Sequence, residues 1–189
     1  MADETDDFEA LLETLRRAAG ILLEANVPFL LAGGLAAWAR GGPRTEHDVD
    51  LLVRPRDAKR ALEALAAAGM RTERPPEGWL FKAYDDGRLV DLIFEPHPGE
   101  VDDGYFERAD ELEVVALRLH VAALEDVLVS KLLALSEQEP DFSGVLEIAR
   151  SVREQIDWQD VRASTEGSPF AQAFFTLAEE LEIVEPTRR

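Results

Sequence analysis

Two aspartates interrupt an otherwise apolar stretch of this chain. Asp48 and Asp50 lie two residues apart in the run Asp48-Val49-Asp50-Leu51-Leu52-Val53, which has the composition of a buried strand. Because successive side chains of a strand point to opposite faces, both carboxyl groups project from the same face. An unpaired carboxylate in apolar surroundings is costly. The fold must therefore bring a cation or hydrogen-bond donors to this strand.

A third acid has a similar setting. Asp91 is flanked by Val90 and by Leu92-Ile93-Phe94, in another run that predicts a strand. Three carboxylates on adjacent strands offer the oxygen ligands that Mg²⁺ prefers, and two such ions can hold an oxygen nucleophile in line with a phosphorus atom. The alternative is that Asp48 and Asp50 are ordinary acids at a strand end and that Asp91 pairs with an arginine.

A glycine pair upstream of the acids favours the metal site. Gly33-Gly34 follows the apolar run Phe29-Leu30-Leu31-Ala32 and precedes a helical stretch, 35–40. Glycines between a strand and a helix allow backbone N–H groups to approach a triphosphate. Arg44 and Thr45 stand just before the acids, where Arg44 is placed to contact a phosphate or an acid. Together these residues predict a nucleotide pocket.

Strand and helix patterns are mixed over the first two-thirds of the chain, and Asp85-Asp86-Gly87 predicts a hairpin turn. We expect helices over 7–26, 35–40 and 56–68 and strands over 29–32, 48–53, 79–84, 88–94, 112–116 and 118–121. From Leu124 onward the pattern is helical only, over 124–137, 142–154, 158–165 and 169–181. The predicted fold is therefore an α/β (α+β) core, residues 1–121, with a C-terminal helical part, residues 122–189, packed on it.

Composition limits the classes of function. The chain has 189 residues, with 39 acidic and 20 basic side chains and a formal net charge of −19. This balance argues against sequence-independent binding of DNA, which relies on Lys and Arg. The absence of cysteine excludes disulfides, thiolate metal sites and cysteine nucleophiles. The acidic N-terminus is unlike a secretory signal, and the longest uncharged stretch, 27–39, is too short to span a bilayer, so we expect a cytoplasmic protein with no membrane partner.

The order of these motifs resembles the DNA polymerase β-like nucleotidyltransferase superfamily. The resemblance covers about residues 28–94 and consists of Leu31-Ala32-Gly33-Gly34, the stretch from Arg44 to Val53, and Val90-Asp91-Leu92-Ile93-Phe94. It implies a nucleotidyltransferase-type mixed sheet with flanking helices, and transfer of a nucleoside monophosphate from an NTP with two Mg²⁺ ions and release of pyrophosphate. It also implies that Asp48 and Asp50 bind both metal ions, and that Asp91 binds one and helps to activate the acceptor hydroxyl.

A second, narrower resemblance concerns the helix that begins at Leu124. The segment from Leu124 to Ala134, followed by Asp141, is similar to AbiEii-type nucleotidyltransferases, including the MenT toxins. This similarity implies that Lys131 lies near the nucleotide phosphates. Lys131 shares a helix face with Leu124, Val127, Leu128 and Leu135. The alternative is that its stem lies along apolar surface while its ammonium group reaches water.

We expect tRNA or a protein as the acceptor, with a cationic small molecule as the alternative. The AbiEii/MenT resemblance implies tRNA or protein, a toxin role and an antitoxin partner, and six basic against four acidic residues over 40–60 would suit a phosphate ligand. Arg44-Thr45-Glu46-His47-Asp48 also resembles aminoglycoside nucleotidyltransferases, which implies a cationic small-molecule acceptor. Nine acids against Arg108 alone over 91–113 suit that acceptor or a solvated surface. A third alternative is a non-catalytic antitoxin or partner-binding module.

Overall fold

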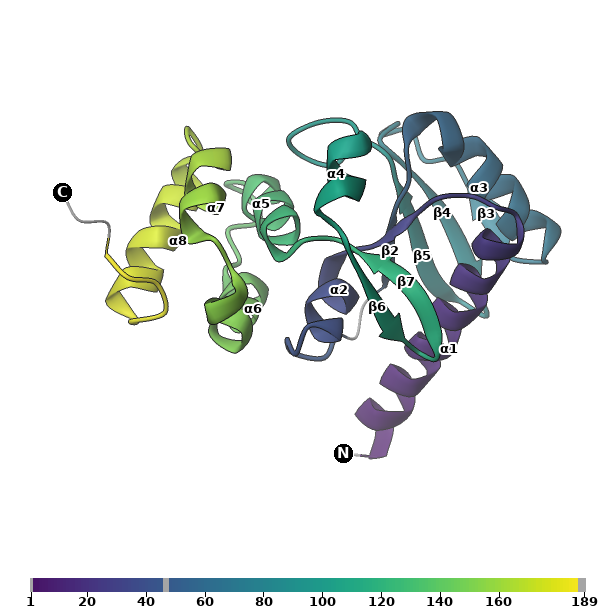
Figure 1. Ribbon diagram of the computed structural model, residues 1–189, viewed down its shortest axis with the longest axis horizontal. Helices are drawn as coiled ribbons and strands as arrows, with labels where there is room; N and C mark the ends of the chain where they lie inside the picture. Colours follow the sequence, from purple (N-terminus) through teal and green to yellow (C-terminus); the bar gives the residue numbers. More distant parts are fainter. Residues whose placement is uncertain (1, 46–47, 187–189) are drawn as a thin grey trace.

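The computed structural model describes residues 2–45 and 48–186 and is built around a seven-stranded mixed sheet (Figure 1). The strand order is β3-β4-β5-β2-β1-β7-β6. The strands are β1 (Leu30–Leu31), β2 (Val49–Leu52), β3 (Arg71–Glu73), β4 (Leu80–Asp85), β5 (Arg88–Ile93), β6 (Asp110–Val114) and β7 (Leu117–Val121). Central β2 pairs parallel with β5 and antiparallel with β1. This arrangement confirms the mixed α/β core expected from the sequence.

The hairpin formed by β4 and β5 fixes the register of the sheet near the acids. Its turn is Asp86-Gly87, and both residues have positive φ angles, 48° and 90°. Such a turn suits the twist of a two-residue hairpin. Asp85 is thereby set opposite Arg88, and three residues further along each strand Lys82 is set opposite Asp91.

Helices α1 (Ala2–Glu24) and α3 (Pro55–Ala67) cover one face of the sheet. From α1, Thr14 donates a hydrogen bond to Asp85 of β4 and Arg17 forms an ion pair with the same carboxylate. Because side chains alternate along a strand, Asp85 and Lys82 point to opposite faces. The α1 and α3 layer therefore lies on the face opposite Lys82.

Two short elements were not expected from the sequence. Strand β3 has three residues at the edge of the sheet, and α4 (Asp103–Arg108) has six. The side chain of Asp102 accepts hydrogen bonds from the backbone N–H groups of Gly104 and Tyr105, which stabilises the start of α4. Elements of this length are too short to produce a clear hydrophobic period.

The C-terminal third, from α5 onward, is helical, as expected, and lies at one end of the molecule (Figure 1). Its elements are α5 (Leu124–Ala134), α6 (Ser143–Val152), the 3₁₀ helix η1 (Arg153–Gln155), α7 (Trp158–Ser164) and α8 (Pro169–Glu180). These helices bury a cluster of their own that includes Phe174 and Phe175. Ala37 of α2 (Gly33–Ala39) belongs to the same cluster, so the two parts of the chain share packing. Among the described residues, none of the helices has the length and apolar character needed to cross a bilayer.

Candidate active site

The glycine pair places the start of α2 directly against the acids. Gly33 has a φ of +57°, and a Cβ atom there would overlap the carboxylate of Asp50. A Cβ atom on Gly34 would lie 2.7 Å from the Cβ atom of Thr45. Glycine is thus required at position 33 both by its left-handed backbone and by the neighbouring side chain.

The three aspartates form one cluster, as the sequence predicts. Asp50 of β2 lies directly opposite Asp91 of the parallel strand β5, and Asp48 immediately precedes β2. One carboxylate oxygen from each acid lies within 4.8 Å of the others. Asp91 is only 8% exposed, whereas Asp48 and Asp50 are partly exposed. Three carboxylates thus converge on one point at the surface of the sheet.

Burial and mutual repulsion both disfavour the charged forms of these acids. Burial is the largest cause that raises the pKa of Asp50 to about 7; the charge of Asp48 raises it further and the charge of Lys131 lowers it. Burial also raises the pKa of Asp91 to about 6, against the opposing charge of Lys82. Without a cation, the cluster therefore retains protons close to neutral pH.

The donor set fits a divalent metal ion. Oδ1 of Asp91 is buried and has no hydrogen-bond partner among the described residues. Such an orphaned carboxylate oxygen is unfavourable unless a cation or a donor reaches it. Since all three groups offer hard oxygen ligands, Mg²⁺ or Mn²⁺ matches them better than a metal that favours thiolate or imidazole.

The structure brings Lys131 to the cluster as well. Lys131 is partly buried on α5, and its ammonium charge is close enough to Asp50 to lower the pKa of that carboxyl. Helix α5 contacts α2, the helix that begins at the glycine pair. This arrangement sets a lysine beside the acids, on a helix that packs against the one beginning at the glycine pair.

Other residues named from the sequence have different surroundings. The guanidinium of Arg44 lies 5.1 Å from the centre of the Phe8 ring, although Arg44 was expected at a phosphate or an acid. Asp141 is exposed, and hydrogen bonds from the Ser143 hydroxyl and from the Ser143 N–H, at 2.9 Å, lower its pKa, so it shapes the start of α6. Glu46 and His47 lie outside the described residues.

Lys82 is a charged residue of the site that the sequence analysis did not identify. Its Nζ atom lies 3.8 Å from Oδ1 of Asp91 across the β4–β5 pair. The signal was present in the sequence, because a two-residue turn at Asp86-Gly87 fixes which residues of the hairpin face each other. Counting from that turn sets Lys82 opposite Asp91.

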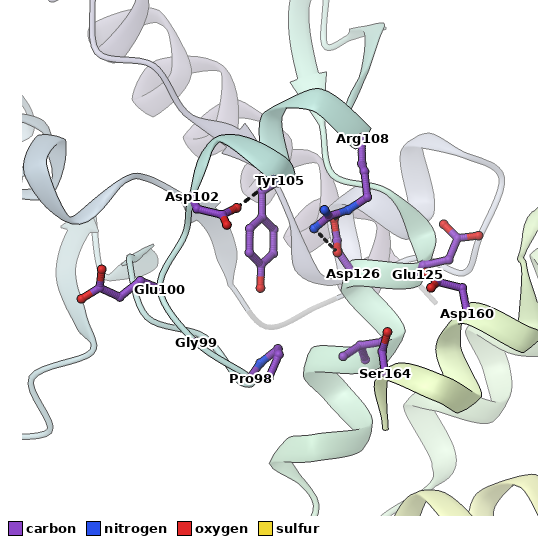
Figure 2. Close-up of a pocket in the computed structure, with 11 residues that line it drawn as sticks. Pro98, Gly99, Glu100, Asp102, Tyr105, Arg108, Glu125, Asp126, Asp160 and Ser164 are labelled. Carbon is purple, nitrogen blue, oxygen red and sulfur yellow. Dashed lines mark hydrogen bonds and ion pairs between the residues drawn. The ribbon is translucent and has the colours of Figure 1, made fainter. Parts of the chain in front are cut away.

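A separate cavity of about 410 Å³ lies between α4, α5 and α7 (Figure 2). Arg108 of α4 and Asp126 of α5 form an ion pair of 2.9 Å at its edge, and the ring of Tyr105 lies beside them. Burial raises the pKa of Asp126 and of Tyr105. The described lining contains none of the residues predicted for the site. Its residues on α5 lie on the side of that helix opposite Lys131. The lining residues are Pro98, Gly99, Glu100, Asp102, Tyr105, Arg108, Glu125, Asp126, Val129, Asp160 and Ser164.

Comparison with protein families gives a match over most of the chain. The model of a family described as uncharacterised nucleotidyltransferase matches residues 5–181 of the chain. No functionally curated protein matches the sequence significantly.

Several solved structures share the fold. The antibiotic-resistance factor ANT(2″)-Ia, solved in solution, has a TM-score of 0.64 and 14% identity and covers 92% of this chain and 98% of that chain. A putative nucleotidyltransferase from Thermotoga maritima has a TM-score of 0.52 and 18% identity, covering 76% and 90%. The lincosamide adenylyltransferase LnuA, bound to lincomycin, has a TM-score of 0.51 and 13% identity, covering 81% and 97%. At these identities the likeness concerns the fold.

Proposed function

Because the chain belongs to this nucleotidyltransferase family, we propose that it transfers a nucleoside monophosphate from an NTP to the hydroxyl group of an acceptor. The observation that supports this most directly is the cluster of Asp48, Asp50 and Asp91 beside the Gly33 turn. In the reaction the acceptor oxygen forms a bond to the α-phosphorus, the bond from that phosphorus to the oxygen bridging to the β-phosphate breaks, and pyrophosphate leaves.

The aspartates would bind two Mg²⁺ ions, with Asp48 and Asp50 contacting both and Asp91 contacting one. Bound Mg²⁺ supplies positive charge to the phosphate oxygens and favours ionisation of a coordinated hydroxyl. By the superfamily resemblance, Asp91 would also help to activate the acceptor hydroxyl by accepting its proton.

The triphosphate would lie between the glycine turn and α5. Gly33 and Gly34 are partly exposed, the Thr45 side chain occupies the space that a Cβ atom on Gly34 would need, and Lys131 would supply an ammonium group from α5. Arg44 would have to leave the Phe8 ring to join them.

A cationic small molecule is the acceptor class that the charge distribution favours. The basic residues over 40–60, which would have to form a path for RNA, are largely neutralised by ion pairs with acids (Arg40, Arg54, Arg56, Lys59 and Arg60). Three of these five lie on α3, which covers the face opposite Lys82. With a net charge of −19, the protein would attract a cation more readily than a polyanion. Two of the structures with this fold were solved with antibiotic-derived ligands, adenylyl-2″-tobramycin on ANT(2″)-Ia and lincomycin on LnuA.

A tRNA or protein acceptor is the second candidate, and the AbiEii/MenT-like similarity of the Lys131 helix supports it. In that case the chain would be the toxin of a toxin–antitoxin pair, with an antitoxin as partner. A non-catalytic antitoxin with the same fold is disfavoured, because all three acids are present and gathered together.

The test is a transfer assay with each of the four NTPs labelled at the α-phosphate. Purified protein and Mg²⁺ are incubated with aminoglycosides, lincomycin, total tRNA or lysate protein, and label transfer and pyrophosphate release are both measured. Asp50→Asn should abolish transfer, whereas Asp86→Asn, in the exposed hairpin turn, should keep it. Transfer by the Asp50→Asn variant at the wild-type rate would overturn the proposal.

A further inference from the structure

The acids of the site are bounded by a lysine on each side. Lys82, Asp91 and Asp50 occupy matching positions on the neighbouring strands β4, β5 and β2, so their side chains form one row on one face of the sheet. At the other end of the row, Lys131 approaches Asp50 from α5. The chain contains only three lysines against 17 arginines, and two of the three stand at this row.

Lys82 does not satisfy the carboxylate that it neutralises. Its Nζ atom is 3.8 Å from Oδ1 of Asp91, which is beyond hydrogen-bond distance, and that oxygen has no hydrogen-bond partner among the described residues. The Lys82 side chain is 28% exposed and that of Asp91 is 11% exposed, so the pair lies in a partly dehydrated setting. The Lys82 ammonium group is thus a positive point charge close to a carboxylate oxygen that has no hydrogen-bond partner among the described residues.

We propose that Lys82 is a positioning residue of the metal site. Before metal ions bind, its ammonium group is the counter-ion of Asp91. The ammonium group attracts the carboxylate toward β4, on the side away from Asp50, and repels a divalent cation on the Asp91 side. This repulsion makes binding on the Asp91 side the weaker event, so that it depends on the negative charge of the incoming nucleotide. The inference rests on the metal site of the proposed function and adds a residue to it.

Mn²⁺ binding to the nucleotide-free protein tests this role without any transfer reaction. Free Mn²⁺ is measured by electron paramagnetic resonance at about pH 8, which lies above the pKa of about 7 of the Asp50 carboxyl. Removing one nearby positive charge in Lys82→Met should tighten Mn²⁺ binding about ten-fold. Lys82→Arg keeps the charge and should bind Mn²⁺ as the wild type does.

Lys59→Met is the matched control, because Lys59 is 70% exposed on α3 and pairs only with Glu63 among the described acids. Its Mn²⁺ affinity should equal that of the wild type, which separates a local effect from a change in net charge. Thermal unfolding of each variant identifies any loss of fold.

Two results would overturn the inference and are distinguishable. If the wild type binds Mn²⁺ in an Asp50-dependent manner and Lys82→Met, still folded, binds it with unchanged or weaker affinity, Lys82 has no such role and the metal site stands. If neither the wild type nor a folded Lys82→Met variant binds Mn²⁺, the proposed metal site fails and the role of Lys82 fails with it. A folded Lys82→Met variant with tighter binding, restored to normal by Lys82→Arg, supports the inference.

Discussion

The carboxylate of Asp50 fills the space that a Cβ atom on Gly33 would need. A backbone hydrogen bond links the same two segments, because the N–H of Ala32, next to Gly33, donates to the carbonyl oxygen of Asp50 at 2.9 Å. The glycine turn and the metal ligand are therefore one packed unit, and a change in either must displace the other.

Gly33→Ala should damage both the fold and the site. A left-handed φ costs an L-residue about 1–2 kcal/mol, and the overlap with Asp50 adds to this. We expect a lower Tm and loss of Mn²⁺ binding, measured by calorimetry. Gly20→Ala is the control, since Gly20 lies within α1 with no atom near its missing Cβ, and it should raise stability by about 0.5–1 kcal/mol. A Gly33→Ala protein that binds Mn²⁺ normally would contradict the packing described.

Each of the three aspartates should be needed for transfer. Asp48→Asn, Asp50→Asn and Asp91→Asn each remove one charged ligand, so the cation is held less well and the phosphate charge is less stabilised. We expect a loss of at least about 100-fold in kcat/KM, equal to about 2.7 kcal/mol, with the fold retained by circular dichroism. Three fully active variants would refute the superfamily interpretation of the site.

The metal-free protein should become less stable as pH rises from about 4 to about 7. The folded pKa of Asp50, about 7, lies above its unfolded value of 3.8, so the folded state binds more protons than the unfolded state in this window. The free energy of unfolding then falls with rising pH.

Thermal unfolding in EDTA at several pH values measures this effect. Asp50→Asn should flatten the profile and raise stability near pH 8 by about 1–3 kcal/mol. Added Mg²⁺ should restore stability to the wild type but not to this variant. A wild-type profile without this fall would mean that burial and the charge of Asp48 do not raise the pKa of Asp50 as described.

Lys131→Met should weaken nucleotide binding while the packing of α5 is kept, because methionine replaces the apolar stem and removes the charge. A charge-assisted contact is worth about 1.5–3 kcal/mol, or roughly 10- to 150-fold in affinity. Calorimetry with a non-hydrolysable NTP analogue and Mg²⁺ measures it, with Lys59→Met as control. An unchanged affinity would indicate that the Lys131 ammonium group only reaches water.

Charge reversal on α3 separates the acceptor classes. Arg56 and Lys59 are 71% and 70% exposed, so Arg56→Glu with Lys59→Glu changes the surface charge with little effect on packing. If the acceptor is RNA, the double variant should transfer to it much more slowly than the wild type. Wild-type transfer should also fall steeply with added salt, because phosphate contacts release counterions. We expect instead that transfer to a cationic small molecule is unchanged by this double substitution. Transfer to tRNA that depends on both residues would favour the second candidate.

Much of the site could be predicted from sequence because its elements are local. The apolar runs around Asp48, Asp50 and Asp91 predict strands, and β2 and β5 form over 49–52 and 88–93 with the acids paired as expected. Helix α2 begins at Gly33 itself, two residues before the expected start, since a glycine with left-handed φ can begin the turn. Helix α1 begins at Ala2 instead of Asp7 and ends at Glu24 instead of Asn26, because periodicity does not fix the ends of a helix to the residue.

The contacts of the basic residues could not be predicted, because they depend on segments far apart in the chain. Arg54 lies over the Phe106 ring at 3.6 Å and pairs with Asp103, 49 residues away. Arg40 pairs with Asp110, 70 residues away. Local charge counts therefore overstated the positive character of this region. The division of the chain at residues 121 and 122 stays a prediction.

Helix α2 packs in both hydrophobic clusters of the molecule and also touches the acids of the candidate site. Gly33, at one end, touches Asp50, while Ala37 is packed in the cluster of the C-terminal helices. Seven helical residues span only about 10 Å. A substitution in the cluster of the C-terminal helices is distant in sequence from the aspartates. It can still displace α2, and through Gly33 it can displace the carboxylate of Asp50. Mutations that inactivate the protein should therefore be found in that apolar cluster as well as at the acids, and loss of activity alone will not identify a residue as part of the chemistry.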